Sequence, residues 1–541
     1  MRPVLSFAAV LGLAALAGAQ DPKGPAPRRL LFIQASGYLY VNPLTAAPDW
    51  AGPPRAAERF AAALRVPVAK GNNQLFVLTD TSAASPHPTR AAVATALDRF
   101  CATTREQDRA VIVFSGHAIE RAGGPFFVPL DGDPDAPATL VPVADVYARL
   151  DKLKAAQKVV IWDVCRHNPD RVRGRRDGGP MSEGLFKALT AVPAGVQVLV
   201  SCSPGERGLE YVPSGLQTGS AYLDALRRAA ADEFAQLGPA DPIPVDAWNQ
   251  GAAKTVVAGA VATGARGAKQ TPAAVGTAPK APAPFDPKAA PARRADLPEP
   301  PKPPTADVKA VLDELALPPL FEADRSQVGA VPFAPDALKG TAPDVSVEEV
   351  LKAAEKYPLR AAVLRSLQAV REVWPRGGKE AKGVTPLAAP VAERTKKTIS
   401  DAQQPLAEAV LRLEAELEAL RAVEGHRAKE TRRWQAHYDL TLAEVRLRVV
   451  VLNEYNLLLA RVRTETLPDL APGAPGWRLT AGDKITSRKE MKDLLAAAQE
   501  GFEKVAADHK GTPWEVLARR SRATVPGLRW EPLPVPKATD Q

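Results

Sequence analysis

Five short apolar segments alternate with helical patterns in the first half of this 541-residue chain. The apolar segments are rich in Val, Ile and Leu and span residues 30–33, 75–78, 111–114, 159–162 and 196–200. Strands buried on both faces of a parallel sheet have this nearly continuous apolar composition. Segments with helical spacing lie between or after them, at residues 57–64, 89–100, 143–153, 181–189 and 219–230. We therefore predict an α/β domain, a mostly parallel sheet flanked by helices, over residues 28–240.

The remainder of the chain has a different composition. Eleven of the 33 residues from Pro272 to Pro304 are proline, and a segment of this kind cannot build a core. We assign 251–306 to a disordered Pro/Ala-rich linker, 307–400 to a helical region and 401–525 to a helical bundle or hairpin, all-α in character. A 4-3-4-3 spacing typical of coiled coils joins Leu406, Val410, Leu413, Leu417 and Leu420. Such a seam needs a partner surface, either within the same chain or on another chain, and we expect the tail to be an interaction or self-association module.

Residues 1–19 have the features of a secretory signal peptide. Arg2 gives a positive start, Val4 to Leu16 form an apolar core, and Ala17-Gly18-Ala19 resembles a cleavage site. We therefore expect an exported protein, periplasmic or secreted, with an uncleaved anchor as the alternative. No later apolar stretch reaches the roughly 18 residues of a membrane span. The net charge of +9 is mild for this length, and no basic stripe interleaved with aromatics predicts nucleic-acid binding.

Two chemically active side chains follow two of the apolar segments. His117 comes just after residues 111–114, and Cys165 comes just after residues 159–162. Ligands of open parallel sheets bind beyond the carboxyl ends of the strands, so neighbouring strands would bring both side chains to one edge. An imidazole can activate a thiol for attack on a carbonyl, and the turn at Gly116 would offer amides to the oxyanion. A loop histidine with a packed thiol is the alternative, as is a disulfide between Cys165 and Cys202.

These segments resemble the caspase-like cysteine peptidases, most closely the bacterial metacaspases, over residues 28–235. The family pattern SGHG and DAC at two strand ends is matched here by Ser115-Gly116-His117-Ala118 and Asp163-Val164-Cys165. FFVPLDGD, VLVSCSPGERGLE and GSAYLDAL are similar to further family segments. The resemblance implies a cysteine endopeptidase with His117 as general base and Cys165 as nucleophile. It also implies that Asp163 and Ser115 line a pocket for basic P1 side chains.

The resemblance implies no required cofactor, although some metacaspases bind activating calcium near positions that match Asp131 and Asp145. Ordinary carboxylates of a loop and a helix start are the alternative for these two residues. Family members are also cut in loops after the nucleophile. Four arginines would form such a self-cleavage site here, with a mobile basic loop as the alternative: Arg171, Arg173, Arg175 and Arg176.

The chain departs from the family pattern at two positions. Ala118 replaces the usual Gly after the histidine, and Ala56 stands where the family has an acidic pocket residue. Glu206 or Glu210 would have to supply that second carboxylate. These departures favour an alternative function, a catalytically inactive caspase-fold scaffold whose helical tail binds a protein partner. A periplasmic ligand-binding domain is a third option, but no motif predicts it.

Overall fold

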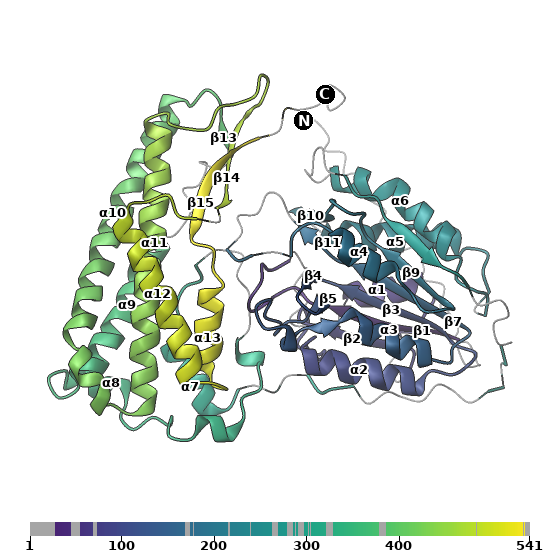
Figure 1. Ribbon diagram of the computed structural model, residues 1–541, viewed down its shortest axis with the longest axis horizontal. Coiled ribbons are helices and arrows are strands. Elements are labelled where there is room, and N and C mark those ends of the chain that lie inside the picture. Colours follow the sequence, from purple (N-terminus) through teal and green to yellow (C-terminus); the bar gives the residue numbers. More distant parts are fainter. Residues whose placement is uncertain are drawn as a thin grey trace, which may run out of the picture.

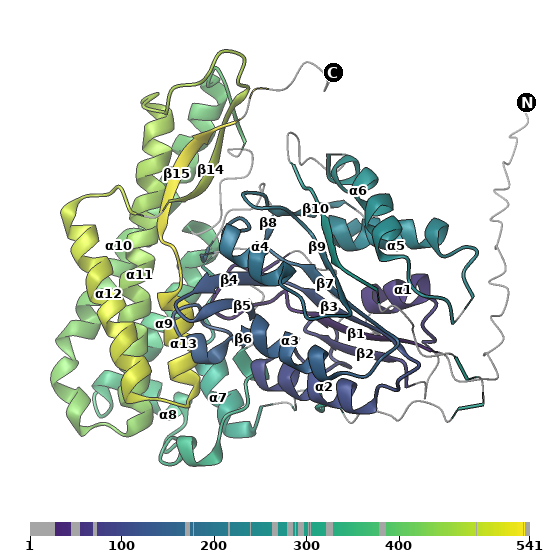
Figure 2. The ribbon, with the colours of Figure 1, turned by 45° about the vertical axis from the view of Figure 1, so that its right-hand side comes forward.

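The computed structural model describes residues 27–44, 55–68, 73–167, 174–176, 178–214, 217–238, 240–261, 269–278, 285–286, 288–289, 297–300, 302, 304–320, 328–377, 386–482, 484–533 and 535. The predicted signal peptide, Arg171 and Arg173 lie outside these residues. An α/β domain and an elongated helical region lie side by side (Figures 1 and 2). None of the helices in the described ranges is both long and apolar enough to cross a membrane.

A six-stranded sheet forms the centre of the α/β domain, with the strand order β12-β9-β7-β3-β1-β2. All neighbouring strands run parallel except β12, which pairs antiparallel with β9. The five parallel strands coincide with the five predicted segments: β1 (Arg28–Gln34), β2 (Leu75–Thr79), β3 (Arg109–Ser115), β7 (Gln157–Asp163) and β9 (Val196–Val200). The predicted mostly parallel sheet is therefore confirmed.

Helices cover both faces of this sheet, because alternate strand residues point to opposite sides. Leu30 and Phe32 of β1 pack in the core with α1 (Arg55–Ala63), α5 (Ala221–Glu233) and α6 (Val245–Val261). Leu31 and Ile33 pack in the opposite core with α2 (Arg90–Thr103), α3 (Val143–Lys152) and α4 (Glu183–Thr190). Each fully buried aliphatic side chain of this kind contributes roughly 1.5–3 kcal/mol. Thr89 caps α2, as its position before the helical pattern predicts.

Two small sheets and a short helical turn extend from the carboxyl edge of the central sheet. One small sheet is antiparallel and contains β4 (His117–Arg121), β5 (Gly124–Val128) and β6 (Val141–Pro142), with η1 (Pro137–Thr139) before β6. The other contains β8 (Arg166–His167), β10 (Gly208–Ser214) and β11 (Gln217–Ser220). β4 follows β3, and β8 follows β7, so both begin where ligands of a parallel sheet bind.

Part of the predicted linker 251–306 belongs to the α/β domain instead. Helix α6 continues to Val261, and β12 (Ala273–Gly276) forms an edge strand of the central sheet. The Gln270 side chain donates a hydrogen bond to the Ser201 carbonyl over 2.8 Å and accepts one from the Leu209 N–H over 2.9 Å. These long-range pairings order residues whose local composition favours an extended chain.

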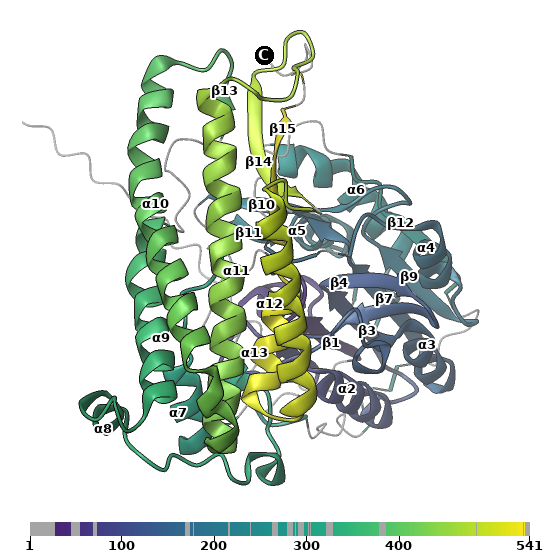
Figure 3. The same ribbon diagram turned by 60° about the vertical axis from the view of Figure 1, so that its left-hand side comes forward.

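Four long helices pack in succession in the helical region (Figure 3): α9 (Pro358–Gly377), α10 (Glu393–Ala422), α11 (Arg432–Arg463) and α12 (Lys489–Asp508). Shorter segments are α7 (Ala306–Glu314), η2 (Val328–Ala330), η3 (Pro335–Leu338), α8 (Val347–Lys352), η4 (Glu424–Lys429) and α13 (Pro513–Arg522). Leu406, Leu413, Leu417 and Leu420 of the predicted seam lie in one core cluster with residues of α9 and α11. The seam therefore has a partner surface within the same chain.

The helical region also contains a small antiparallel sheet that the sequence analysis did not predict. Its strands are β13 (Leu387–Ala388), β14 (Gly476–Gly482) and β15 (Gly527–Pro532). Trp530 of β15 is buried and donates its indole N–H to the Leu458 carbonyl of α11 over 3.1 Å. The sheet thus packs against the bundle through a side chain far away in sequence.

A buried polar cluster joins α7, α11 and α13. The indole N–H of Trp514 donates to Nδ1 of His437 over 3.1 Å, and Nε2 of His437 lies 2.9 Å from the Glu314 carboxylate. Arg433 pairs with the same carboxylate over 2.7 Å. Burial by itself raises the pKa of Glu314, but the hydrogen bond from His437 and the charge of Arg433 outweigh it and leave that pKa below its usual value. Burial lowers the pKa of His437.

The helical region packs against loops at the carboxyl edge of the central sheet. Arg519 of α13 forms an ion pair with Asp133 and lies over the Tyr40 ring, 5.3 Å from its centroid. The Val525 N–H donates to the Gly174 carbonyl over 2.9 Å, and Thr524 forms an isolated β-bridge with Arg175. These contacts connect the helical region to the segment that follows Cys165.

Candidate active site

The structure brings His117 and Cys165 to the same edge of the central sheet. β3 and β7 are neighbours, and Ser115 lies opposite Asp163 in their register. His117 begins β4 two residues after β3 ends, and Cys165 follows β7 by two residues. The Cys165 sulfur lies 3.9 Å from the carbonyl oxygen of Ala118, the residue next to His117. Adjacent strands thus place the two residues at one edge of the sheet.

Cys165 occupies a strained turn. Its φ of 58° lies in the left-handed region, which a non-glycine residue enters at a cost of about 1–3 kcal/mol. The Ser201 hydroxyl holds the preceding peptide, because it accepts from the Val164 N–H over 3.2 Å and donates to the Val164 carbonyl over 3.1 Å. The Gly208 N–H donates to the Cys165 carbonyl over 3.0 Å. The surrounding structure therefore fixes the direction of the thiol.

Asn42 and Tyr38, in the loop after β1, orient His117. Nε2 of the imidazole lies 2.7 Å from the backbone carbonyl oxygen of Asn42. A carbonyl oxygen only accepts, so Nε2 carries the proton, and Nδ1 is the nitrogen that can accept one in the neutral ring. The His117 backbone N–H donates to the Tyr38 hydroxyl over 2.8 Å, and the two rings lie 4.9 Å apart. A partner that fixes the tautomer is what a general base requires.

The loop that orients His117 is joined to the segment after Cys165. The Asn42 side-chain oxygen accepts from the N–H groups of Gly174 and Arg175 over 3.2 and 3.1 Å. Arg175 is buried and donates to the Tyr38 carbonyl over 3.1 Å. Arg176, by contrast, is exposed. Of these two arginines from the predicted self-cleavage loop, only Arg176 is therefore accessible to a peptidase in this conformation.

Gly116 has a structural role that corrects its predicted contribution to an oxyanion site. Its N–H donates to the Asp163 carbonyl over 3.0 Å, so this amide is used within the sheet edge. A Cβ atom at this position would collide with the Tyr38 hydroxyl and would lie 3.1 Å from the Phe127 ring. Glycine is thus needed here for the close approach of Tyr38, which in turn bonds His117.

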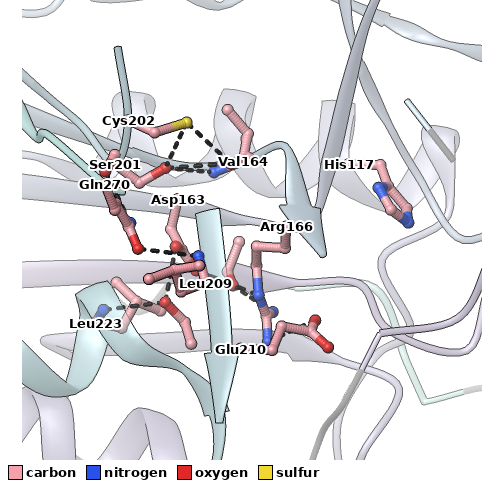
Figure 4. Close-up of polar contacts among 12 residues, drawn as sticks. His117, Asp163, Val164, Arg166, Ser201, Cys202, Leu209, Glu210, Leu223 and Gln270 are labelled. Atoms are coloured by element: carbon pink, nitrogen blue, oxygen red, sulfur yellow. Dashed lines mark hydrogen bonds and ion pairs between the residues drawn. The ribbon is translucent and has the colours of Figure 1, made fainter. Parts of the chain in front are cut away.

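Asp163 and Ser115 belong to a buried polar cluster at the carboxyl ends of β7 and β3. Asp163 is labelled in Figure 4. The Ser115 hydroxyl donates to one Asp163 oxygen over 2.7 Å, and the Ser220 hydroxyl donates to the other over 2.8 Å. Arg166 also belongs to this cluster: it donates to the Ser115 oxygen over 3.1 Å and pairs with Glu210 over 3.3 Å. Burial raises the pKa of Asp163, whereas Arg166 and the two hydroxyl groups act to lower it.

The two glutamates considered as replacements for the missing carboxylate have different roles. Glu210 is buried beside Arg166, its ion-pair partner. Glu206 accepts a hydrogen bond from the Thr271 N–H over 2.6 Å and pairs with Lys269 over 3.1 Å. It therefore binds the segment that leads into β12. Ala56 is half-buried in α1. Of the two glutamates, Glu210 is therefore the one that lies in the same buried cluster as Asp163.

Asp131 and Asp145 lie at two different helix starts. The Asp131 carboxylate accepts from the backbone N–H of Arg90, the first residue of α2, over 2.8 Å. Asp145 is exposed in the first turn of α3. Across the described ranges, no three His, Cys, Asp or Glu side chains are grouped to hold a metal ion. The two carboxylates thus lie at the starts of two separate helices, and no step below depends on a metal.

All three cysteines are free thiols, so Cys165 and Cys202 are not joined in a disulfide. The Cys202 sulfur packs 3.9 Å from the Val164 carbonyl oxygen, below the turn that carries Cys165. Cys101 lies in α2, where burial raises the pKa of its thiol to about 11. Of the three sulfur atoms, that of Cys165 is the one in contact with β4, the strand that begins at His117.

The sequence analysis missed Asn42, Tyr38, Ser201 and Arg166 as residues of this site. Only Arg166 carried a usable signal, because it follows Cys165 directly and a charged residue is rarely buried without a partner. The other three act through backbone groups or lie far from the dyad in sequence. Their roles depend on the folded arrangement of the loops.

Comparison with known proteins agrees with this arrangement. Residues 56–243 match the family model of the caspase domain. No curated protein matches the chain. The matched residues include both His117 and Cys165. This part of the chain is therefore a caspase-like domain.

Proposed function

We propose that this protein is a cysteine endopeptidase that uses His117 and Cys165 as a catalytic dyad. The observation that carries the proposal is the strained turn of Cys165 beside a histidine whose tautomer is fixed by the Asn42 carbonyl. Family membership supports a peptide or protein as the substrate. His117 precedes Cys165 in the sequence, which is the order that the resemblance implied for the general base and the nucleophile.

The chemistry follows from the tautomer of His117. Nδ1 takes the proton from the Cys165 thiol, and the thiolate attacks the carbonyl carbon of the scissile peptide bond. The C–N bond then breaks as Nδ1–H protonates the leaving amine, which leaves a thioester on Cys165. Water, deprotonated by the same nitrogen, hydrolyses the thioester and regenerates the thiol. Backbone amides other than that of Gly116 would have to stabilise the oxyanion, because the Gly116 N–H already bonds Asp163.

Substrate access requires the loops around the dyad to move. His117 and Cys165 are each only 1% exposed. The same burial favours the second candidate function, an inactive caspase-fold scaffold. In that case His117 and Cys165 would have no catalytic role, and the helical region would bind a protein partner. Export to the periplasm or the medium remains our proposal for both candidates, based on the N-terminal sequence.

Turnover of a fluorogenic peptide panel separates the two candidates. The panel carries Arg, Lys, Asp or Ala at P1 and is assayed with a reductant, with and without calcium. We expect hydrolysis by the wild type and loss of more than about 1000-fold in kcat for Cys165→Ala. Cys202→Ala is the matched control, since it removes another buried thiol and should retain activity. No turnover by a correctly folded wild type, together with no alkylation of Cys165 by a peptidyl chloromethyl ketone, would favour the scaffold.

A further inference from the structure

A cavity of about 290 Å³ lies where the helical region meets the α/β domain. Most of its lining is apolar and comes from the segment after α7, from α11 and from α13: Leu315, Leu317, Leu320, Leu440 and Leu517. Arg175 contributes to the lining from the α/β domain. The cavity reaches the surface, because its lining residues Ala316 and Pro319 are exposed. A mainly apolar pocket of roughly 300 Å³ with a few polar groups is typical of a small-molecule site.

The polar part of the lining lies on one face of α11. Thr441, Glu444 and Arg448 are spaced three and four residues apart, and all three are buried. Nη2 of Arg448 donates to the Pro318 carbonyl over 2.7 Å, Nε lies 3.5 Å from the Glu444 carboxylate, and the guanidinium lies over the Trp374 ring. These contacts fix the orientation of the Arg448 side chain.

Two buried polar atoms of this face have no hydrogen-bond partner in the described part of the chain, namely Nη1 of Arg448 and the hydroxyl oxygen of Thr441. A buried polar group without a partner costs about 1–3 kcal/mol, so such groups are normally satisfied by protein, water or ligand. Because both residues line the cavity, a molecule inside it is the partner that these atoms can obtain.

The charges of the lining favour an anion over a cation. Burial lowers the pKa of Arg448 to about 10, Glu444 acts against this change, and the charge of Arg520 on α13 adds to it. Arg448 and Arg520 are thus close enough to repel each other, and both line the cavity. With Arg175, the described lining contains three guanidinium groups and one carboxylate. A negative group in the cavity would reduce this repulsion, whereas a cation would increase it.

A carboxylate on an apolar body fits both parts of the lining. Its oxygens accept hydrogen bonds from a guanidinium and from a hydroxyl group, and such charge-assisted bonds are strong. Its apolar body would cover the leucine side chains, which an inorganic anion would leave in contact with water. An apolar molecule without a polar group would leave Nη1 of Arg448 and the Thr441 hydroxyl unsatisfied.

We propose that this cavity binds a small organic carboxylate with an apolar body, whose oxygens contact Arg448 and Thr441. The ligand would lie between the two parts of the chain, since Arg175 lines the cavity and also donates to the Tyr38 carbonyl of the α/β domain. The inference does not depend on the proposed peptidase function, and its test needs no peptide turnover.

Isothermal titration calorimetry of the full chain tests the ligand class. The probes are 3-phenylpropionate and 4-methylpentanoate, and the matched controls are the amides of the same two acids, which keep the shape and lack the charge. We expect one molecule of acid to bind per chain in a saturable way. The acids should bind about 10- to 100-fold more tightly than their amides, because the charge-assisted hydrogen bond is lost in the amides.

Two variants locate the site. Arg448→Met keeps the length of the side chain and should weaken binding of the acids by about 10- to 100-fold. Thr441→Val keeps the shape and should weaken it by about 3- to 10-fold. The melting temperature of ligand-free Thr441→Val should not fall, because the hydroxyl has no partner to lose in the described structure. Arg365→Met, at an exposed arginine of α9 outside the cavity, is the matched control and should leave the affinity unchanged.

Hydrogen–deuterium exchange gives an independent location for the probe. Saturating 3-phenylpropionate should slow exchange in peptides covering residues 312–320 and 517–524, and it should not change the peptide covering residues 196–200 of the central sheet.

The proposal is overturned if neither acid binds, if acids and amides bind equally well, or if Thr441→Val and a folded Arg448→Met keep the wild-type affinity. In the first case water alone fills the cavity. If Arg448→Met does not fold, Thr441→Val and the exchange pattern decide the location.

Discussion

Ser201→Ala is expected to loosen the turn that carries Cys165. Ser201 is completely buried. Its hydroxyl accepts a hydrogen bond from the Val164 N–H over 3.2 Å and donates one to the Val164 carbonyl over 3.1 Å. Alanine cannot replace either bond. A buried backbone group left without its partner costs about 1–3 kcal/mol. Because the Val164 carbonyl keeps its contact with the Cys202 sulfur, we expect a total cost of about 2–4 kcal/mol. The left-handed conformation of Cys165 adds strain that favours opening of this turn.

Hydrogen–deuterium exchange measures this loss locally, which suits a chain with more than one domain. A cost of about 2–4 kcal/mol corresponds to an exchange rate about 30- to 1000-fold faster for the peptide covering residues 159–165. If the peptidase function is correct, kcat should fall with this change, because the thiol is no longer held in place. Ser203→Ala is the control, since its hydroxyl donates to the Thr271 carbonyl at an exposed site. Equal exchange of this peptide in the two variants would refute the assignment of Ser201 as the residue that holds the turn.

Three further predictions concern the helical region and its contact with the α/β domain. Leu413→Ala should lower the free energy of unfolding by about 2–5 kcal/mol, because Leu413 is fully buried. Leu411→Ala, at a site 67% exposed, should change that free energy by less than about 0.5 kcal/mol. Equal effects of the two variants in urea unfolding would contradict the packing of α10. Arg519→Ala removes the ion pair with Asp133 and should weaken the contact between the helical region and the α/β domain by about 1–2 kcal/mol. Limited proteolysis should then cleave the chain between these two regions faster than in the wild type. An unchanged cleavage rate would count against this contact. The lowered pKa of Glu314 means that its charge stabilises the fold above about pH 4.5, and this stabilisation is lost as the pH falls through the folded pKa. The melting temperatures of the wild type and of Glu314→Gln should therefore differ near pH 7 and converge in acid. A difference that stays constant with pH would show that the charge of Glu314 is not involved.

The candidate site shows where sequence reasoning succeeds and where it stops. His117 and Cys165 could be paired from the sequence because each follows an apolar strand, and carboxyl ends of parallel strands share an edge. Asn42, whose carbonyl fixes the tautomer of His117, could not be found in this way, because any residue has a backbone carbonyl. The hydrogen bond of Gly116 with Asp163 likewise depends on the register of β3 and β7.

The sequence by itself determined the elements whose signals are local. Continuous apolar runs predicted the five parallel strands, the cap at Thr89 predicted the start of α2, and leucine spacing predicted the long helix α10. The tertiary structure alone decided the elements that depend on distant partners. β12 forms in a Pro/Ala-rich stretch because β9 offers it an open edge, and β13, β14 and β15 pair across nearly 150 residues of sequence. The same holds for Arg166. Its charge is visible in the sequence, but its burial beside Ser115 and Glu210 exists only after folding, because that polar cluster is assembled from separate strands.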